Sequence, residues 1–182
     1  LWTQIRRLLA RKRPQPSSVH TIDRPIILCH GYHMRGWTMA ILAFWLRTMG
    51  RSTVIMPTFS SVKSGIQNYA TQLTGVILDV LDRTGADAVD LVGHSMGGLA
   101  VRACVAKAVR DDRSDIRVAH IVTLASPHCG TPNWVFTWGE SGLDMKPGSS
   151  FFQWLKDEPF DLNPTNIFSS FDAMVPEESA GG

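Results

Sequence analysis

The chain of 182 residues is long enough for one well-buried core and short for two, so we expect a single domain. With 44% hydrophobic and 19% charged residues its composition is that of a globular protein, which excludes the disordered and fibrous classes. Five of the 18 basic residues lie in residues 1–13, which hold no acid, and the remaining 13 face 16 acidic residues. This balance gives no reason to expect nucleic acid as a partner.

The basic start of the chain also carries large apolar residues at helical spacing, which favours a short cationic amphipathic helix (Trp2, Ile5, Leu8 and Leu9). Such a helix at residues 1–13 suits peripheral contact with an anionic membrane, and a solvated, fraying terminus is the alternative. We expect a leader and linker at residues 1–18 and one folded domain at 19–182. No apolar run is long enough to span a membrane and no signal segment is visible, which leaves the localisation open between membrane-associated, secreted and cytoplasmic.

Short apolar runs without alternation predict strands that are buried on both faces of a sheet. They lie at residues 25–31, 52–57, 88–94, 118–127 and 166–172. Apolar residues three and four apart predict helices between them, and a third helix runs from Ser95 to about Arg110. The first helix is expected to bury Trp37, Ala40, Ile41, Phe44, Trp45 and Thr48. The second, which Gly85 ends, is expected to bury Ile66, Tyr69, Ala70, Leu73, Val76, Ile77, Val80 and Leu81.

Strands that alternate with helices predict an open α/β sheet, mostly parallel, with helices on both faces. The carboxyl ends of such strands are where function concentrates. Residues 131–160 break the alternation and hold seven of the 16 aromatic residues. We therefore expect this insertion to be an aromatic-rich cap over a site, and a packed satellite core is the alternative.

The cysteines and glycines give no sign of a cofactor. Cys29, Cys104 and Cys129 have neither the spacing of metal ligands nor an even count, so we expect three free thiols that fill space in the structure. No ligand-spaced cluster and no phosphate-cradling glycine loop is present, so we expect neither a metal nor an organic cofactor.

The pentapeptide Gly93-His94-Ser95-Met96-Gly97 matches G-x-S-x-G between a predicted strand and a predicted helix, which is the context that this motif requires. It predicts a nucleophile elbow, in which a strained turn presents the Ser95 hydroxyl. Glycine at positions 93 and 97 prevents collisions with the adjoining strand and helix. The backbone N–H of Met96 opens the helix and is directed to where a carbonyl oxygen would acquire negative charge.

A second backbone donor is expected in CHGYH (29–33), at the end of the first predicted strand. Gly31 permits a sharp turn there, and the N–H of Tyr32 then faces Ser95 across the strand ends. We expect His30 to stabilise this loop through hydrogen bonds rather than to act as a base.

Four segments in this order resemble the α/β-hydrolase lipases and esterases, especially the bacterial triacylglycerol lipases: IILCHGY, DLVGHSMGGLAVR, IVTLASPHCGTP and FSSFDAMVP. The resemblance covers about residues 24–178, and MKPGSSFFQWL (145–155) agrees with cap-proximal segments of such lipases. It implies that Ser95 is the nucleophile, that the Tyr32 and Met96 amides form an oxyanion hole, and that Asp172 orients the catalytic histidine.

The position of Asp172 supports this role, because it follows a predicted strand downstream of the serine, as the chain order Ser, Asp, His requires. Asp157 and Asp161 fit less well, since no strand fixes them. All six histidines precede Asp172, although the chemistry needs an imidazole to accept the serine proton. We expect a fragment that lacks the last strand and helix and has little activity alone. His128 as a substitute base, and a fold that only binds, are the alternatives.

The sequence therefore predicts a serine carboxylic ester hydrolase, a lipase or esterase that acts on acyl esters or lipids through an acyl-enzyme intermediate. The aromatic insertion favours an acyl chain of some length. Acyl transfer or thioester hydrolysis on the same scaffold stays open, and so does a non-catalytic, membrane-associated lipid-binding protein.

Overall fold

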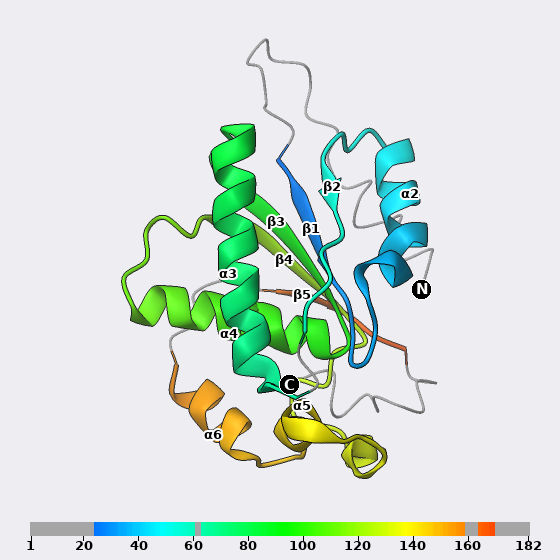
Figure 1. The fold of residues 1–182 in the computed structure, drawn as a ribbon, viewed down its shortest axis with the longest axis vertical. Helices are drawn as coiled ribbons and strands as arrows, with labels where there is room; N and C mark the ends of the chain where they lie inside the picture. Colours follow the sequence, from blue (N-terminus) through cyan, green and yellow to red (C-terminus); the bar gives the residue numbers. More distant parts are fainter. Residues whose placement is uncertain (1–23, 61–62, 159–163, 170–182) are drawn as a thin grey trace.

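A parallel sheet of five strands, in the order β2-β1-β3-β4-β5, forms the centre of the protein (Figure 1). The computed structural model describes residues 24–60, 63–158 and 164–169. The strands are β1 (Ile26–Cys29), β2 (Val54–Ile55), β3 (Val89–His94), β4 (Val118–Leu124) and β5 (Thr165–Ile167). Each lies in or beside a predicted apolar run, and the parallel α/β class is confirmed.

Helices cover both faces of the sheet, as the alternation of elements predicts (Figure 1). Side chains of β1 alternate between these faces, because successive residues of a strand point in opposite directions. Ile27 and Cys29 join the main core with α3 (Gly65–Thr84) and α4 (Met96–Arg110). Ile26 and Leu28 join a smaller core with α2 (Ala40–Thr48).

The α3 helix agrees with the sequence pattern over its whole length. Of its predicted apolar face only Val76 is half-buried, and the other members are buried in the main core. Gly85 ends the helix in the left-handed conformation at φ 63°, and its N–H donates to the Leu81 carbonyl. The three- and four-residue spacing therefore identifies both the helix and the side that it buries.

The α2 helix is correctly predicted as a helix, but its buried face is wrong. All six residues of the expected face, which begins with Trp37 and ends with Thr48, are exposed. The helix instead packs on the sheet through Ala43 and Leu46, and Met39 of the preceding 3-10 helix η1 (Gly36–Met39) joins them. The reason is that α2 is apolar on all sides, so periodicity does not distinguish the side that faces the sheet.

The insertion lies beyond the carboxyl ends of the strands (Figure 1) and contains three short helices, η2 (Pro132–Phe136), α5 (Gly139–Asp144) and α6 (Ser150–Asp157). Phe151 and Phe152 are buried in the main core, whereas Phe136 and Trp138 are exposed. Asp144 accepts a hydrogen bond from the Ile66 N–H at 2.7 Å, which ties α5 to the first turn of α3. The insertion is therefore in part packed core and in part exposed aromatic surface.

The cysteine prediction is correct in part. All three thiols are free, and Cys29 and Cys104 are buried, where burial raises the pKa of both. Cys129 is exposed, so the expectation that it fills space in the core is wrong. It lies on the loop after β4, where the chain leaves the sheet.

The expected leader at residues 1–18 lies outside the described residues. In the part of the chain that the structure describes, no helix is both long enough and apolar enough to cross a bilayer.

Candidate active site

Ser95 lies at the sharp turn between β3 and α4. Its backbone has φ 53° and ψ −126°, a strained conformation for a residue with a side chain, and its N–H donates to the Leu124 carbonyl at 2.8 Å. This bond fixes the turn against the neighbouring strand, while the Ser95 side chain stays half-buried. The strand, turn and helix that the motif requires are all present.

The glycines of the motif are required by close backbone contacts. A Cβ atom on Gly93 would lie 2.5 Å from the Cα and the N of Gly98, well inside normal contact distance. A Cβ atom on Gly97 would collide with the Cys29 carbonyl oxygen and lie 2.7 Å from that of His30. The two glycines therefore let α4 start directly against β3 and β1, as the sequence predicts.

The loop after β1 packs against the turn that carries Ser95. Cys29 pairs with Gly93 in the parallel register, and a Cβ atom on Gly31 would lie 3.2 Å from the Ser95 Cβ. The structure thus brings Gly31 beside Ser95, and Tyr32 is the next residue of the same loop. Met96 is the first residue of α4, so its N–H has no acceptor within that helix.

His30 holds this loop in place and is not free to act as a base. Its Nε2 accepts the Phe59 N–H at 2.9 Å, so the proton of the neutral ring is on Nδ1, which donates to the Gly31 carbonyl at 2.9 Å. Burial lowers the pKa of His30, which keeps the ring neutral. The Tyr69 hydroxyl donates to the His30 carbonyl at 3.0 Å. The expected stabilising role is confirmed.

The Tyr32 side chain connects the same loop to the insertion. Its hydroxyl donates to the Trp138 carbonyl and accepts from the Trp138 N–H, both at 2.8 Å. The ring of His33 contacts both aromatic rings edge to face, with its centroid 6.0 Å from that of Tyr32 and 5.5 Å from that of Trp138. Sequence patterns predict only a backbone role for Tyr32, because no local motif indicates a partner that is more than one hundred residues away.

His128 is engaged at both ring nitrogens. Arg102 can only donate, so Nδ1 accepts from it at 3.3 Å, and Nε2 then donates to the Thr123 hydroxyl at 2.9 Å. The Thr123 hydroxyl in turn donates a hydrogen bond to the Asn166 Oδ1 at 2.8 Å. Burial, together with the nearby Arg102 charge, lowers the pKa of His128 to about 4. These contacts weigh against His128 as a substitute base and make it a structural link between α4, β4 and β5.

The acid expected at Asp172 lies outside the described residues, as does Asp161. The last described strand, β5, ends at Ile167 rather than near position 172. Asp157 is exposed at the last residue of α6. Among the described residues no group of His, Cys, Asp and Glu side chains is arranged to hold a metal ion.

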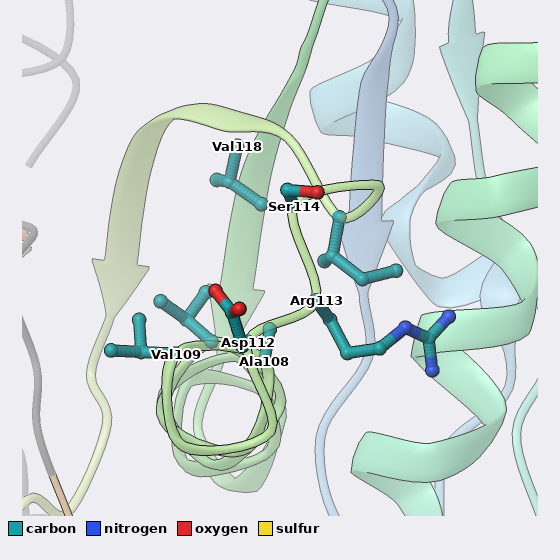
Figure 2. Close-up of a pocket in the computed structure, with 8 residues that line it drawn as sticks. Ala108, Val109, Asp112, Arg113, Ser114 and Val118 are labelled. Atoms are coloured by element: carbon teal, nitrogen blue, oxygen red, sulfur yellow. The ribbon is translucent and has the colours of Figure 1, made fainter.

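A cavity of about 330 Å³ lies at the opposite end of the sheet from Ser95. Figure 2 shows that the end of α4, the loop that follows it and the start of β4 form its walls. Most lining residues are apolar, including Val105, Val109 and Val118, and Asp112, Arg113 and Ser114 supply the polar part. The cavity belongs to the amino ends of the strands and is separate from the elbow.

A parallel sheet that presents a strained serine between a strand and a helix defines the architecture of the α/β hydrolases. The model of the alpha/beta hydrolase family matches residues 26–180, and the chain belongs to this family. The resemblance stated from the four segments is therefore confirmed.

Curated relatives of the chain include lipases and a deacylase. The chain is 32% identical over 108 residues to the GPI inositol-deacylase of Candida albicans, with 59% of this chain and 22% of that protein covered. It is 31% identical over 115 residues to the triacylglycerol lipases of Pseudarthrobacter phenanthrenivorans and Burkholderia plantarii, with 59% of this chain and 34% and 30% of those proteins covered. The chain thus spans about a third or less of the length of these relatives.

Solved structures of lipases share the fold. Aspergillus fumigatus lipase B superposes with a TM-score of 0.69 at 16% identity, covering 91% of this chain and 42% of that one. A phospholipase from Legionella pneumophila gives a TM-score of 0.64 at 15% identity, covering 74% of this chain and 33% of that one. At these identities the likeness concerns the fold alone.

Proposed function

We propose that the protein is a serine ester hydrolase of the lipase and esterase type. The observation that carries the proposal is the strained Ser95 turn, packed directly against the loop that holds Gly31 and Tyr32. The relatives support the same chemistry, because their names, triacylglycerol lipase and GPI inositol-deacylase, both describe the removal of acyl groups.

In the proposed reaction the Ser95 Oγ attacks the acyl carbonyl and forms the new C–O bond. Its proton passes to an imidazole and then to the departing alcohol as the bond between acyl carbon and alcohol breaks. Water next attacks the acyl-enzyme, releases the carboxylic acid and returns the proton to Ser95. The N–H groups of Tyr32 and Met96 stabilise the oxyanion in both halves of the reaction.

Asp172 is proposed to orient the imidazole, in the chain order Ser, Asp, His. The described histidines His30 and His128 are already held by hydrogen bonds at both ring nitrogens. Because the histidine follows the acid in this chain order, the base is expected from a histidine after Asp172 in the complete gene product. On this account the 182-residue chain by itself hydrolyses esters only slowly.

The substrate is proposed to be an acyl ester with a chain of some length. Exposed aromatic side chains on the insertion, Phe136 and Trp138, lie on the segment that Tyr32 connects to the site. They offer apolar surface for an acyl chain near the strand ends.

The experiment is hydrolysis of p-nitrophenyl esters from acetate to laurate by the complete gene product. We expect kcat/KM to rise with chain length, and Ser95→Ala to lower it by about 10⁴-fold or more. Ser126→Ala is the matched control, because the Ser126 hydroxyl is buried close to Gly98 and makes no hydrogen bond within the described part of the chain. Equal activity of Ser95→Ala and Ser126→Ala would contradict the proposal. Hydrolysis of an acyl thioester in place of the oxygen esters would favour the thioesterase alternative.

A further inference from the structure

Four exposed side chains form a continuous apolar face along η1 and α2. Trp37, Ile41 and Phe44 are 72%, 68% and 59% exposed, and Trp45 is exposed beside them. Their spacing places them on one side of the helix. The rings of Phe44 and Trp45 pack edge to face with centroids 5.8 Å apart. We call these four residues the α2 face.

The opposite side of α2 is already used by the sheet. Ala43 and Leu46 pack there with Ile26, Leu28 and Val54 of β1 and β2. The nine residues of α2 include one charged side chain, Arg47, so the helix is apolar nearly all round. A helix of this kind is normally covered on every side, and an exposed apolar patch marks a surface that binds something.

The surroundings of the α2 face are positively charged. Residues 24–78 contain five basic residues and no Asp or Glu. Arg35 precedes η1 and Arg47 lies in the last turn of α2, and both side chains are exposed. Asp90 of β3 is paired with Arg24 and Arg51. The α2 face is therefore flanked by positive charge at both ends.

We propose that the α2 face docks on a bilayer that contains anionic lipids. Tryptophan and phenylalanine favour the boundary between headgroups and acyl chains, and arginine adds attraction to the anionic headgroups. The face is the outer side of a single helix rather than a groove, which suits a planar, deformable surface.

Charge separates this occupant from two protein alternatives, a second copy of the chain and its own residues 1–13. A second copy seated on the same face would bring Arg35 and Arg47 against basic residues of its own kind. Residues 1–13 of this chain contain five basic residues and no acid, so they offer no complementary charge either. An anionic lipid surface supplies both the apolar layer and the opposite charge.

The docked orientation also has a consequence for the candidate site. Trp37 follows Tyr32 by five residues, so the chain allows at most about 18 Å between them. Docking through the α2 face would therefore hold the loop beside Ser95 close to the lipid. The docking itself does not depend on the reaction, so it stands or falls apart from the proposed function.

The test measures co-sedimentation of the full chain with vesicles of phosphatidylcholine, with and without phosphatidylglycerol. The test variant is Trp37→Ser with Phe44→Ser, and the control is Val135→Ser with Leu143→Ser. The control residues are apolar and are 59% and 60% exposed on the insertion, so their exposure matches that of Phe44. Thermal unfolding of each variant is measured as well, to check that the substitutions leave the fold intact.

We expect wild type and control to bind the anionic vesicles, with binding that weakens as salt rises. The α2 variant should bind about tenfold less, at an unchanged melting temperature. Wild-type binding by the α2 variant would overturn the proposal and assign the binding to residues 1–13. An equal loss in the control would also overturn it, as would a wild-type dimer in solution that the α2 substitutions convert to monomer.

Discussion

Replacement of Gly93 by alanine tests whether the elbow depends on close backbone approach. The added Cβ would lie 2.5 Å from the Cα and N of Gly98, about 0.9 Å inside the 3.4 Å at which ordinary contact begins. Both atoms belong to the backbone at the start of α4, so no side-chain rotation relieves the overlap. Overpacking costs about 1–3 kcal/mol, and with a rigid neighbour we expect about 3 kcal/mol. For a domain of this size that lowers the melting temperature by roughly 6–12 °C.

The matched control is Gly75→Ala, in the exposed middle of α3. A Cβ there meets nothing within 4 Å, and alanine is favoured over glycine in a helix by about 1 kcal/mol. This variant should melt about 2–4 °C above wild type. The assay is differential scanning calorimetry of all three proteins under one condition. If Gly93→Ala has the melting temperature of wild type, or if both variants change the melting temperature in the same direction, the steric explanation of the motif is wrong.

Three further predictions concern contacts that hold the site. Tyr32→Phe keeps the ring but removes both hydrogen bonds to Trp138, so we expect about a five- to tenfold lower kcat/KM for p-nitrophenyl esters in the complete gene product. Unchanged kinetics would show that the Tyr32 hydroxyl has no part in holding the site. Asp144→Ala removes the cap on Ile66 and should lower the free energy of unfolding in urea by about 1–2 kcal/mol, a loss that Asp144→Asn should partly restore. His128 has its pKa lowered to about 4, so the unfolded chain takes up its proton first as the pH falls below about 6.5. This histidine alone should cost about 2 kcal/mol of stability between pH 7.5 and pH 5, and a pH dependence just as steep in His128→Gln would contradict its assigned environment.

Patterns local in sequence predicted most of the fold. The elbow glycines, the strand before Ser95 and the helix after it are adjacent in the chain, and steric conflict within a few residues dictates them. The α3 helix was equally clear, because its apolar and polar sides differ. The α2 helix shows the limit of this reasoning. Its apolar residues surround the axis, and only packing against β1 and β2 decides which of them are buried.

Contacts between distant segments could not be predicted from the sequence. Neither the hydroxyl bridge from Tyr32 to Trp138 nor the cap that Asp144 places on α3 leaves a local signal. His128 is on a loop that follows a strand end, which makes it look available in the sequence, whereas Arg102 of α4 and Thr123 of β4 occupy its two ring nitrogens. Asp172 stays a prediction from chain order and from resemblance.

The measurement that bears most directly on the central claim is labelling of the complete gene product with a fluorophosphonate, followed by mass spectrometry of the digested protein. Such a probe forms a covalent bond with an activated serine hydroxyl. We predict a single adduct on the peptide that contains Ser95, retained in Ser126→Ala and lost in Ser95→Ala. No adduct, or an adduct on a different residue, would contradict the assignment of Ser95 as the nucleophile of a serine ester hydrolase.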